Sequence, residues 1–191
     1  LELLYEQLDT LKDDDVLVLA GSIPAGMPQS IYRDIMSRLQ SKRIKIAVDA
    51  TKDLLLNVLA YHPFVIKPNN HELSEIFDIM IDSKEKAVVY AKELQKKGAQ
   101  NVIVSMAGEG AVFVGSDGSV FTSEAPHGVV KNSVGAGDSM VAGFLAGYLA
   151  KGDYAEAFKM GLCTGSASAF SDQLATREEV EQVRRSHIFD F

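Results

Sequence analysis

The chain has little cysteine, no long apolar run and no excess of basic charge, and each of these absences excludes a class of protein. A single cysteine, Cys163, excludes a disulfide scaffold. No run approaches the roughly 18 apolar residues of a membrane span, and no basic-then-apolar signal segment opens the sequence. With 19 Lys and Arg against 26 Asp and Glu, the basic field of a nucleic-acid binder is missing. We therefore expect a reduced, cytoplasmic, soluble protein without a nucleic-acid or membrane partner.

What is present is the composition of a globular domain, with 47% hydrophobic and 24% charged residues, which excludes disorder. The chain opens without methionine inside an apolar stripe at helical spacing, formed by Leu1, Leu4, Leu8 and Leu11. We therefore expect a fragment of a longer protein. No linker, repeat or low-complexity stretch interrupts the sequence, so residues 1–191 are predicted to belong to one α/β domain.

Short apolar segments alternate with amphipathic ones in the first half of the chain, which predicts parallel strands joined by right-handed crossovers. The expected strands are 16–20, 44–48, 64–66 and 102–104, and the expected helices are 28–39, 54–59, 70–77 and 83–97. Short strands are then expected at 111–114, 120–122 and 129–130, followed by helices at 136–150, 154–170 and from 177. The fold class is thus α/β, a mostly parallel sheet flanked by helices with an antiparallel edge in the second half. The fully apolar strand 16–20 is expected to be buried on both faces.

The strongest motif is the heptapeptide 132–138, Asn-Ser-Val-Gly-Ala-Gly-Asp, which runs directly into a helix. Its small residues Gly135, Ala136 and Gly137 allow several backbone N–H groups to converge on one anion at the positive end of the helix. Asp138, in the first turn, can accept a proton from a hydroxyl beside that anion. Charge stabilisation and a positioned base are the two parts that phosphoryl transfer needs. A tight turn with Asp138 as a helix-dipole partner is the structural alternative, but the length of the motif favours function.

Two further loops follow predicted strands. Small residues in the segment Ser105 to Gly110 would let a polyphosphate approach the main chain, although a hairpin turn explains them equally well. In the segment 67–72, Asn69 and Glu72 could hold a hydrated Mg²⁺. An Asn cap with Glu three residues later is the simpler interpretation of that pair from these residues alone.

The loop Gly21 to Gly26 lacks the Lys and Ser/Thr of a phosphate-binding P-loop, and it lacks the Gly-x-Gly-x-x-Gly of a dinucleotide fold. A P-loop and a dinucleotide-binding site are therefore excluded for this segment. A loop that lines a small-molecule site and a plain turn remain equal alternatives for this segment.

Taken in order, these motifs resemble the PfkB family of ribokinase-like carbohydrate kinases. The resemblance implies ATP-dependent phosphorylation of a sugar phosphate, with Mg²⁺, with Asp138 as the general base and with the Gly135–Asp138 amides as the anion hole. Segments 67–73, 132–134 and 169–176 are most similar to members that act on fructose 1-phosphate, and tagatose 6-phosphate is the alternative acceptor. A nucleotide-binding module without catalysis is the alternative from a different class.

The resemblance also implies the remaining site residues. Glu72, with Asn69 through water, would hold Mg²⁺, and Gly21, Ser22 and Asp138 would contact the sugar. ATP would contact Lys67, Asn69, Glu72, Ser105, Ala107, Gly108, Gly110, Gly137, Asp138, Ser166 and Ser168.

Two departures from the family pattern are visible. Ala107 stands where the family usually has a glycine. The family's N-terminal third, which carries the lid, is missing. We therefore expect a nucleotide half-site with little or no kinase activity on its own, and a homodimer only through the missing lid.

Overall fold

Six strands form one sheet in the order β1-β2-β3-β4-β5-β6 in the computed structural model, which describes all of residues 1–191. Strands β1 to β4 are parallel, whereas β5 is antiparallel to both β4 and β6. This arrangement confirms the predicted sheet with its antiparallel edge. The strands are β1 Val16–Ala20, β2 Lys45–Asp49, β3 Val65–Ile66, β4 Asn101–Ser105, β5 Ala111–Val114 and β6 Val120–Ser123.

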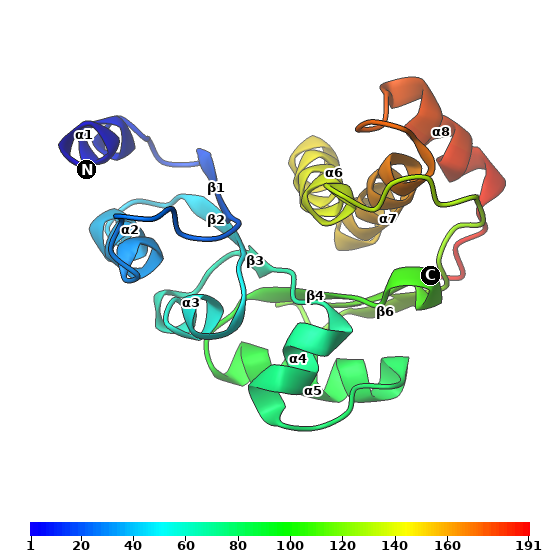
Figure 1. The fold of residues 1–191 in the computed structure, drawn as a ribbon, viewed down its shortest axis with the longest axis horizontal. Coiled ribbons are helices and arrows are strands. Elements are labelled where there is room, and N and C mark those ends of the chain that lie inside the picture. The colour runs from blue at the N-terminus through cyan, green and yellow to red at the C-terminus, as the bar shows by residue number, and fades with distance from the viewer.

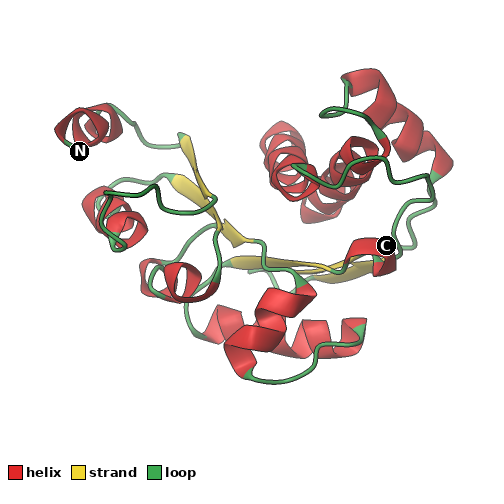
Figure 2. Cartoon of the chain, viewed as in Figure 1, coloured by secondary structure: helices red, strands yellow, loops and turns green.

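Helices cover the two faces of the sheet in separate layers, α1 to α5 on one side and α6 to α8 on the other (Figures 1 and 2). The alternation within β2 shows how one strand serves both layers: Ile46 and Val48 pack in the core under α1 to α5, and Ala47 packs in the core under α6 and α7. The helices are α1 Glu2–Asp9, α2 Ile31–Leu39, α3 Lys52–Leu56, α4 Asn70–Phe77, α5 Lys84–Lys96, α6 Ala136–Lys151, α7 Tyr154–Phe170 and α8 Arg177–Ser186, with 3-10 turns η1 Leu59–Tyr61 and η2 Ala107–Glu109.

Helices α6 and α7 pack against each other through glycines. A methyl group on Gly143 would lie 2.5 Å from Thr164 Oγ1, and one on Gly161 would lie 3.0 Å from the Met140 carbonyl oxygen. The small residues after the heptapeptide therefore permit close helix contact. Cys163 lies in the same layer, where burial raises the pKa of its thiol to about 12 and makes it a packing residue.

Two expectations about strands are wrong. Residues 129–130 form no strand, and both side chains are exposed. The reason is that the N–H groups of Lys131 and Asn132 donate to the Ala169 carbonyl at the end of α7, which holds this segment away from the sheet. Strand β1 is not buried on both faces: it is the edge strand, and Val18 is 46% exposed.

Three expectations about helices need smaller adjustments. The helix expected at 28–39 begins at Ile31, and the one expected at 54–59 divides into α3 and η1. Of the leucine stripe on α1, Leu8 is buried, whereas Leu1 is 53% exposed.

Candidate active site

The C-terminal ends of three parallel strands bring Gly21, Asp49 and Lys67 to one edge of the sheet. Gly21 follows β1 and donates its N–H to the Asp49 carbonyl at 3.0 Å. Lys67 follows β3 and donates its N–H to the Val48 carbonyl at 3.3 Å. Ligands of open α/β sheets bind at this edge, so the candidate site begins here.

The turn into α6 is held in a conformation that leaves backbone donors free. Gly135 has φ +79°, in the left-handed region where glycine is favoured, and a Cβ there would lie 2.9 Å from Leu174 Cδ2. The N–H groups of Gly135, Gly137 and Asp138 have no acceptor in the chain. The Ala136 N–H, in contrast, donates to the Ser133 carbonyl at 3.2 Å. The structure therefore leaves three of the four predicted anion-hole amides available.

Lys67 lies directly against this turn. Its side chain is almost fully buried, and its Nζ pairs with Asp49 Oδ2 at 3.2 Å. A Cβ on Gly137 would be only 3.1 Å from the same Nζ. A buried positive charge thus reinforces the free amides and the positive end of the α6 dipole.

Asp138 and Asp49 line one cavity of about 250 Å³, together with Gly21 and apolar side chains of β1 and α6. Asp138 is exposed and forms no ion pair. Burial raises the pKa of Asp49, the Lys67 ammonium opposes that shift, and the nearby Asp138 charge adds to it. Of the two carboxylates, Asp138 is therefore the one left free to accept a proton.

Asn69 and Glu72 form a complete capping box at the start of α4. Glu72 N–H donates to Asn69 Oδ1, and Asn69 N–H donates to Glu72 Oε2, both at 2.8 Å. The simpler interpretation of this pair is confirmed. No cluster of three or more His, Cys, Asp or Glu side chains could hold a resident metal ion. A hydrated Mg²⁺ that enters with a nucleotide needs few protein carboxylates, and Glu72 fits that more modest role.

The predicted nucleotide loop Ser105 to Gly110 lies beside the segment that contains Asn69. Asn69 and Ser105 form a parallel bridge, and the Ser105 N–H donates to the Pro68 carbonyl at 3.1 Å. Gly108 is exposed with open space around it, whereas Gly110 is needed for packing because a Cβ there would lie 2.0 Å from the Ser123 carbonyl oxygen.

Ala107 adopts φ +48° at the position where a glycine was expected from the family pattern. This left-handed conformation explains why glycine suits the position. The loop accommodates alanine there at a local conformational cost.

Ser168 has a structural contact that the sequence did not reveal. It is 3% exposed, its hydroxyl donates to Ser139 Oγ at 2.9 Å, and it accepts the Ala175 N–H at 3.2 Å. Ser168 thus joins α6, α7 and the following loop, and its predicted contact with ATP would have to displace these bonds. Ser166 is partly exposed, and Gly21 and Ser22 are exposed at the end of β1.

Asp49 is the site residue that the sequence analysis missed. The signal was present, since this aspartate ends an apolar segment whose carboxyl end belongs to a parallel sheet. Its partner could not be identified without knowing that β2 and β3 are neighbours.

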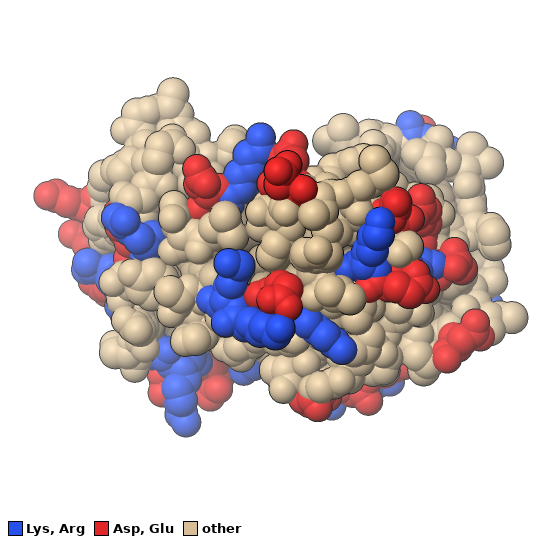
Figure 3. All heavy atoms as spheres, turned by 90° about the horizontal axis from the view of Figure 1, so that it is seen from below, with Lys and Arg blue, Asp and Glu red and all other residues tan.

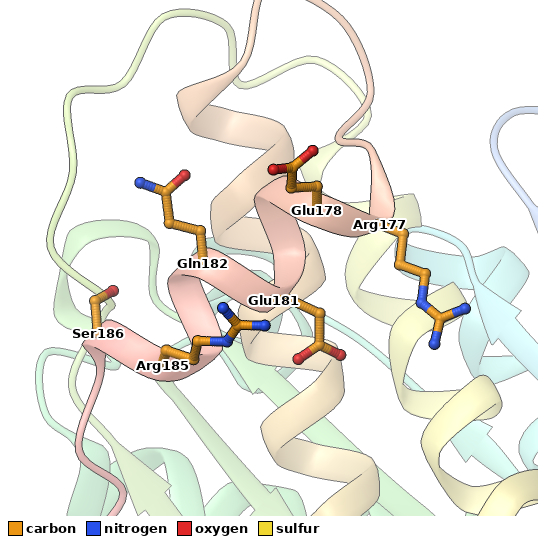
Figure 4. A pocket seen from close by; sticks show the side chains of 6 residues that line it. All are labelled: Arg177, Glu178, Glu181, Gln182, Arg185 and Ser186. Carbon is orange, nitrogen blue, oxygen red and sulfur yellow. The ribbon is translucent and has the colours of Figure 1, made fainter.

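A larger hollow of about 760 Å³ lies along α8, but six residues of that single helix line it (Figure 4). They are polar or charged with both signs, and no side chain of another element joins them. Charges of both signs also mix on the face seen from below (Figure 3). Neither surface brings side chains of several elements together around one point, so the strand-end cavity remains the candidate site.

No helix of the chain is long and apolar enough to cross a membrane.

Known proteins are similar to this chain in sequence and in fold. The model of the pfkB family of carbohydrate kinases matches residues 1–179. A 1-phosphofructokinase of Bacillus subtilis is 44% identical over 93% of the chain and 58% of its own length. A D-tagatose-1-phosphate kinase of Bacillus licheniformis is 30% identical over 87% of the chain and 55% of its own length.

A solved structure shows the same fold. The phosphofructokinase-2 of Escherichia coli, crystallised in complex with substrates and products, superposes with a TM-score of 0.88 at 27% identity. That match covers 96% of this chain and 61% of the other. The chain thus spans roughly three fifths of the relatives that it matches. On its sequence and its fold, the chain belongs to the pfkB family of carbohydrate kinases.

Proposed function

We propose that this chain carries the phosphoryl-transfer half of an ATP-dependent sugar-phosphate kinase, with fructose 1-phosphate as the acceptor. The observation that carries the proposal is the unpaired carboxylate of Asp138 in the same helical turn as free backbone amides, with the Lys67 ammonium behind that turn. The 44% identity to a protein named 1-phosphofructokinase supports this acceptor.

In the proposed reaction the chain's residues bind, orient and accept one proton. The free N–H groups of Gly135, Gly137 and Asp138 and the buried Lys67 ammonium hold the transferring phosphoryl group. Asp138 takes the proton of the acceptor hydroxyl as its oxygen attacks the γ-phosphorus in line, and ADP leaves from the opposite side. Glu72, with Asn69 through water, would hold Mg²⁺, which would neutralise phosphate charge when bound with ATP.

The nucleotide is proposed to extend from this turn along the exposed Ala107 and Gly108 and the adjacent Ser105. Gly21 and Ser22, exposed at the end of β1 beside the cavity, are proposed to face the sugar. Ser166, which is partly exposed on α7, is also proposed to face the nucleotide.

A second acceptor has a specific observation in its favour. The relative named D-tagatose-1-phosphate kinase is 30% identical over most of the chain, so a tagatose phosphate is the alternative substrate. Tagatose 6-phosphate and tagatose 1-phosphate are therefore assayed beside fructose 1-phosphate, and the larger kcat/KM identifies the acceptor.

The chain alone is proposed to have little or no turnover. The cavity is walled by β1, the end of β2 and α6, and the β1 face toward it carries the exposed Val18. Water therefore reaches the reacting groups, whereas phosphoryl transfer needs an enclosed site. Robust turnover by residues 1–191 alone would contradict this part of the proposal.

The decisive experiment replaces Asp138 by Asn in a form of the protein that covers the full length of its relatives. Turnover is expected to fall by about 10²–10⁴-fold because the general base is lost, while ATP affinity is retained. Asp53→Asn, an exposed residue of α3 with the same change of charge, is the matched control. A nucleotide-binding module without catalysis would have no turnover to lose, and unchanged turnover in Asp138→Asn would overturn the proposed role of the base.

Nucleotide binding is tested separately by calorimetry with ATP and Mg²⁺ on the 191-residue chain. Gly137→Val is expected to abolish binding, because even a Cβ at this position would lie 3.1 Å from Lys67 Nζ. Loss of binding in the variant would support phosphate contact at the turn into α6. Full retention would place the phosphates elsewhere.

A further inference from the structure

The carboxylate of Asp49 has no part in the proton transfer described above, yet it lies in the same cavity as the proposed base. It projects from the end of β2, and its side chain is 17% exposed. A carboxylate close to a phosphate site repels the ligand, so its presence needs a physical reason.

The reason lies in its partner. Lys67 Nζ is buried, and Asp49 Oδ2, at 3.2 Å, is its only ion-pair partner. The missing side chain of Gly137 leaves the space into which this ammonium fits. The pair therefore fixes a positive charge directly beneath the free amides of the turn into α6.

The other groups that face Asp49 show what the pair prevents. From α6, Asp138 lies close enough for its charge to raise the pKa of Asp49. From α2, the Tyr32 hydroxyl already donates to the carbonyls of Ala20 and Gly21 at 2.7 and 3.2 Å. Without Asp49, the flexible lysine chain is free to turn toward Asp138, which lines the same cavity as Asp49, and an ion pair there would occupy the base.

We propose that Asp49 is a positioning residue, which holds the Lys67 ammonium under the turn into α6, toward the nucleotide phosphates and away from Asp138. This inference rests on the proposed function. When phosphate binds, the ammonium is shared between Asp49 and phosphate oxygens, and no covalent bond changes. The ion pair holds the Lys67 side chain in position before the nucleotide binds.

The test measures the affinities of the chain for ATP with Mg²⁺ and for adenosine by calorimetry. Asp49→Asn is expected to weaken ATP by about 10-fold or more, which corresponds to 1.4 kcal/mol, and to leave adenosine unchanged because adenosine has no phosphates. Asp53→Asn, exposed on α3, makes the same charge change and is expected to alter neither affinity.

A double-mutant cycle with Lys67→Met separates positioning from direct repulsion. Because Asp49 acts through Lys67, Asp49→Asn is expected to cause no further loss of ATP affinity when Lys67 is already Met. Additive losses would mean that Asp49 acts on the nucleotide by another route, and would overturn the inference.

Removing one partner of a buried ion pair can unfold a chain, so a second variant keeps the test decisive. Asp49→Glu retains the charge but moves it by one methylene, and its ratio of ATP to adenosine affinity is expected to lie between those of the native chain and Asp49→Asn. A native ratio in both variants, tighter ATP binding, or equal loss of ATP and adenosine would overturn the inference.

The inference and the proposed function fail in different ways. If the folded native chain does not bind ATP, both fail. If it binds ATP and Asp49→Asn leaves the ratio unchanged, only the inference fails, and the Asp138→Asn test still decides the function.

Discussion

The edge strand β1 and the inner strand β5 have similar apolar sequences but differ in how they are covered. In β5 every residue is buried, and Phe113 is 0% exposed beneath Phe144 and Phe158 of the overlying helices. In β1, an equally apolar strand, Val18 is 46% exposed. The difference shows that an apolar sequence makes a strand suited to burial, whereas its neighbours decide whether it is buried. The candidate site lies beside β1, the less covered strand.

The largest test of this comparison is a side-chain truncation beside each strand. Phe158→Ala, which removes a fully buried ring packed on Phe113 and Phe121, is expected to cost about 3–5 kcal/mol of the free energy of unfolding. Val18→Ala is expected to stay within about 0.5 kcal/mol of the native chain because its side chain fills little space between neighbours. Urea unfolding measures both. Equal losses would mean that β1 is covered in solution.

A second test compares two glycines that flank the covered strand β5, both with φ near +90°. Gly118→Ala meets open space and is expected to cost about 1–2 kcal/mol from the backbone conformation alone. Gly110→Ala also forces a Cβ to within 2.0 Å of the Ser123 carbonyl oxygen, which adds about 1–3 kcal/mol of overpacking. Thermal unfolding of the two variants checks the order. Equal costs would show that β5 and β6 separate easily.

The smallest expected effect is a difference in pH dependence between a carboxylate of the α6–α7 layer and one of the candidate site. In the helix layer, a hydrogen bond from Lys151 lowers the pKa of Glu156 below its ordinary value of 4.5, and Arg184 adds to this. Its stabilisation is therefore present above pH 4.5 and is lost as pH falls through the lowered pKa. Glu156→Gln is expected to remove about 1 kcal/mol at neutral pH and little in acid, as measured by urea midpoints across pH.

The pKa of Asp49 is shifted in the opposite direction. Burial raises its pKa above the ordinary 3.8, so its contribution to stability is fully present below pH 3.8 and is lost as pH rises through the raised pKa. The difference in urea midpoint between the native chain and Asp49→Asn is expected to slope with pH in the opposite direction to that of Glu156→Gln. Slopes of the same sign would show that in solution the Lys67 ammonium, rather than burial, sets the direction of the Asp49 pKa shift.

Much of the fold was predictable because its signals are local. The capping box of Asn69 and Glu72 sets the start of α4 at the predicted residue, and both ends of α7 lie at the predicted residues. The strand predicted at residues 129–130 is absent because the strand propensity of two valines does not depend on whether a neighbouring strand is available. Their neighbours instead bond to the end of α7.

The candidate site was predictable only in part, for the same reason. The turn at Gly135 and the position of Asp138 follow from seven consecutive residues. The engagement of the Ala136 amide, the burial of Ser168 and the pairing of Asp49 with Lys67 each depend on geometry or on segments distant in sequence. These are contacts that no local pattern specifies.

The sequence by itself determined the strands and helices of the alternating half, the glycine turn at the start of α6 and the family resemblance, because periodicity, capping and left-handed turns are properties of short segments. The tertiary structure alone decided which charges meet. Parallel pairing places the end of β2 beside the end of β3, and the packing of α6 places Gly137 against the side chain of Lys67. An ion pair depends on a few ångströms between residues far apart in the chain, and that separation is fixed only when the sheet and its helices assemble.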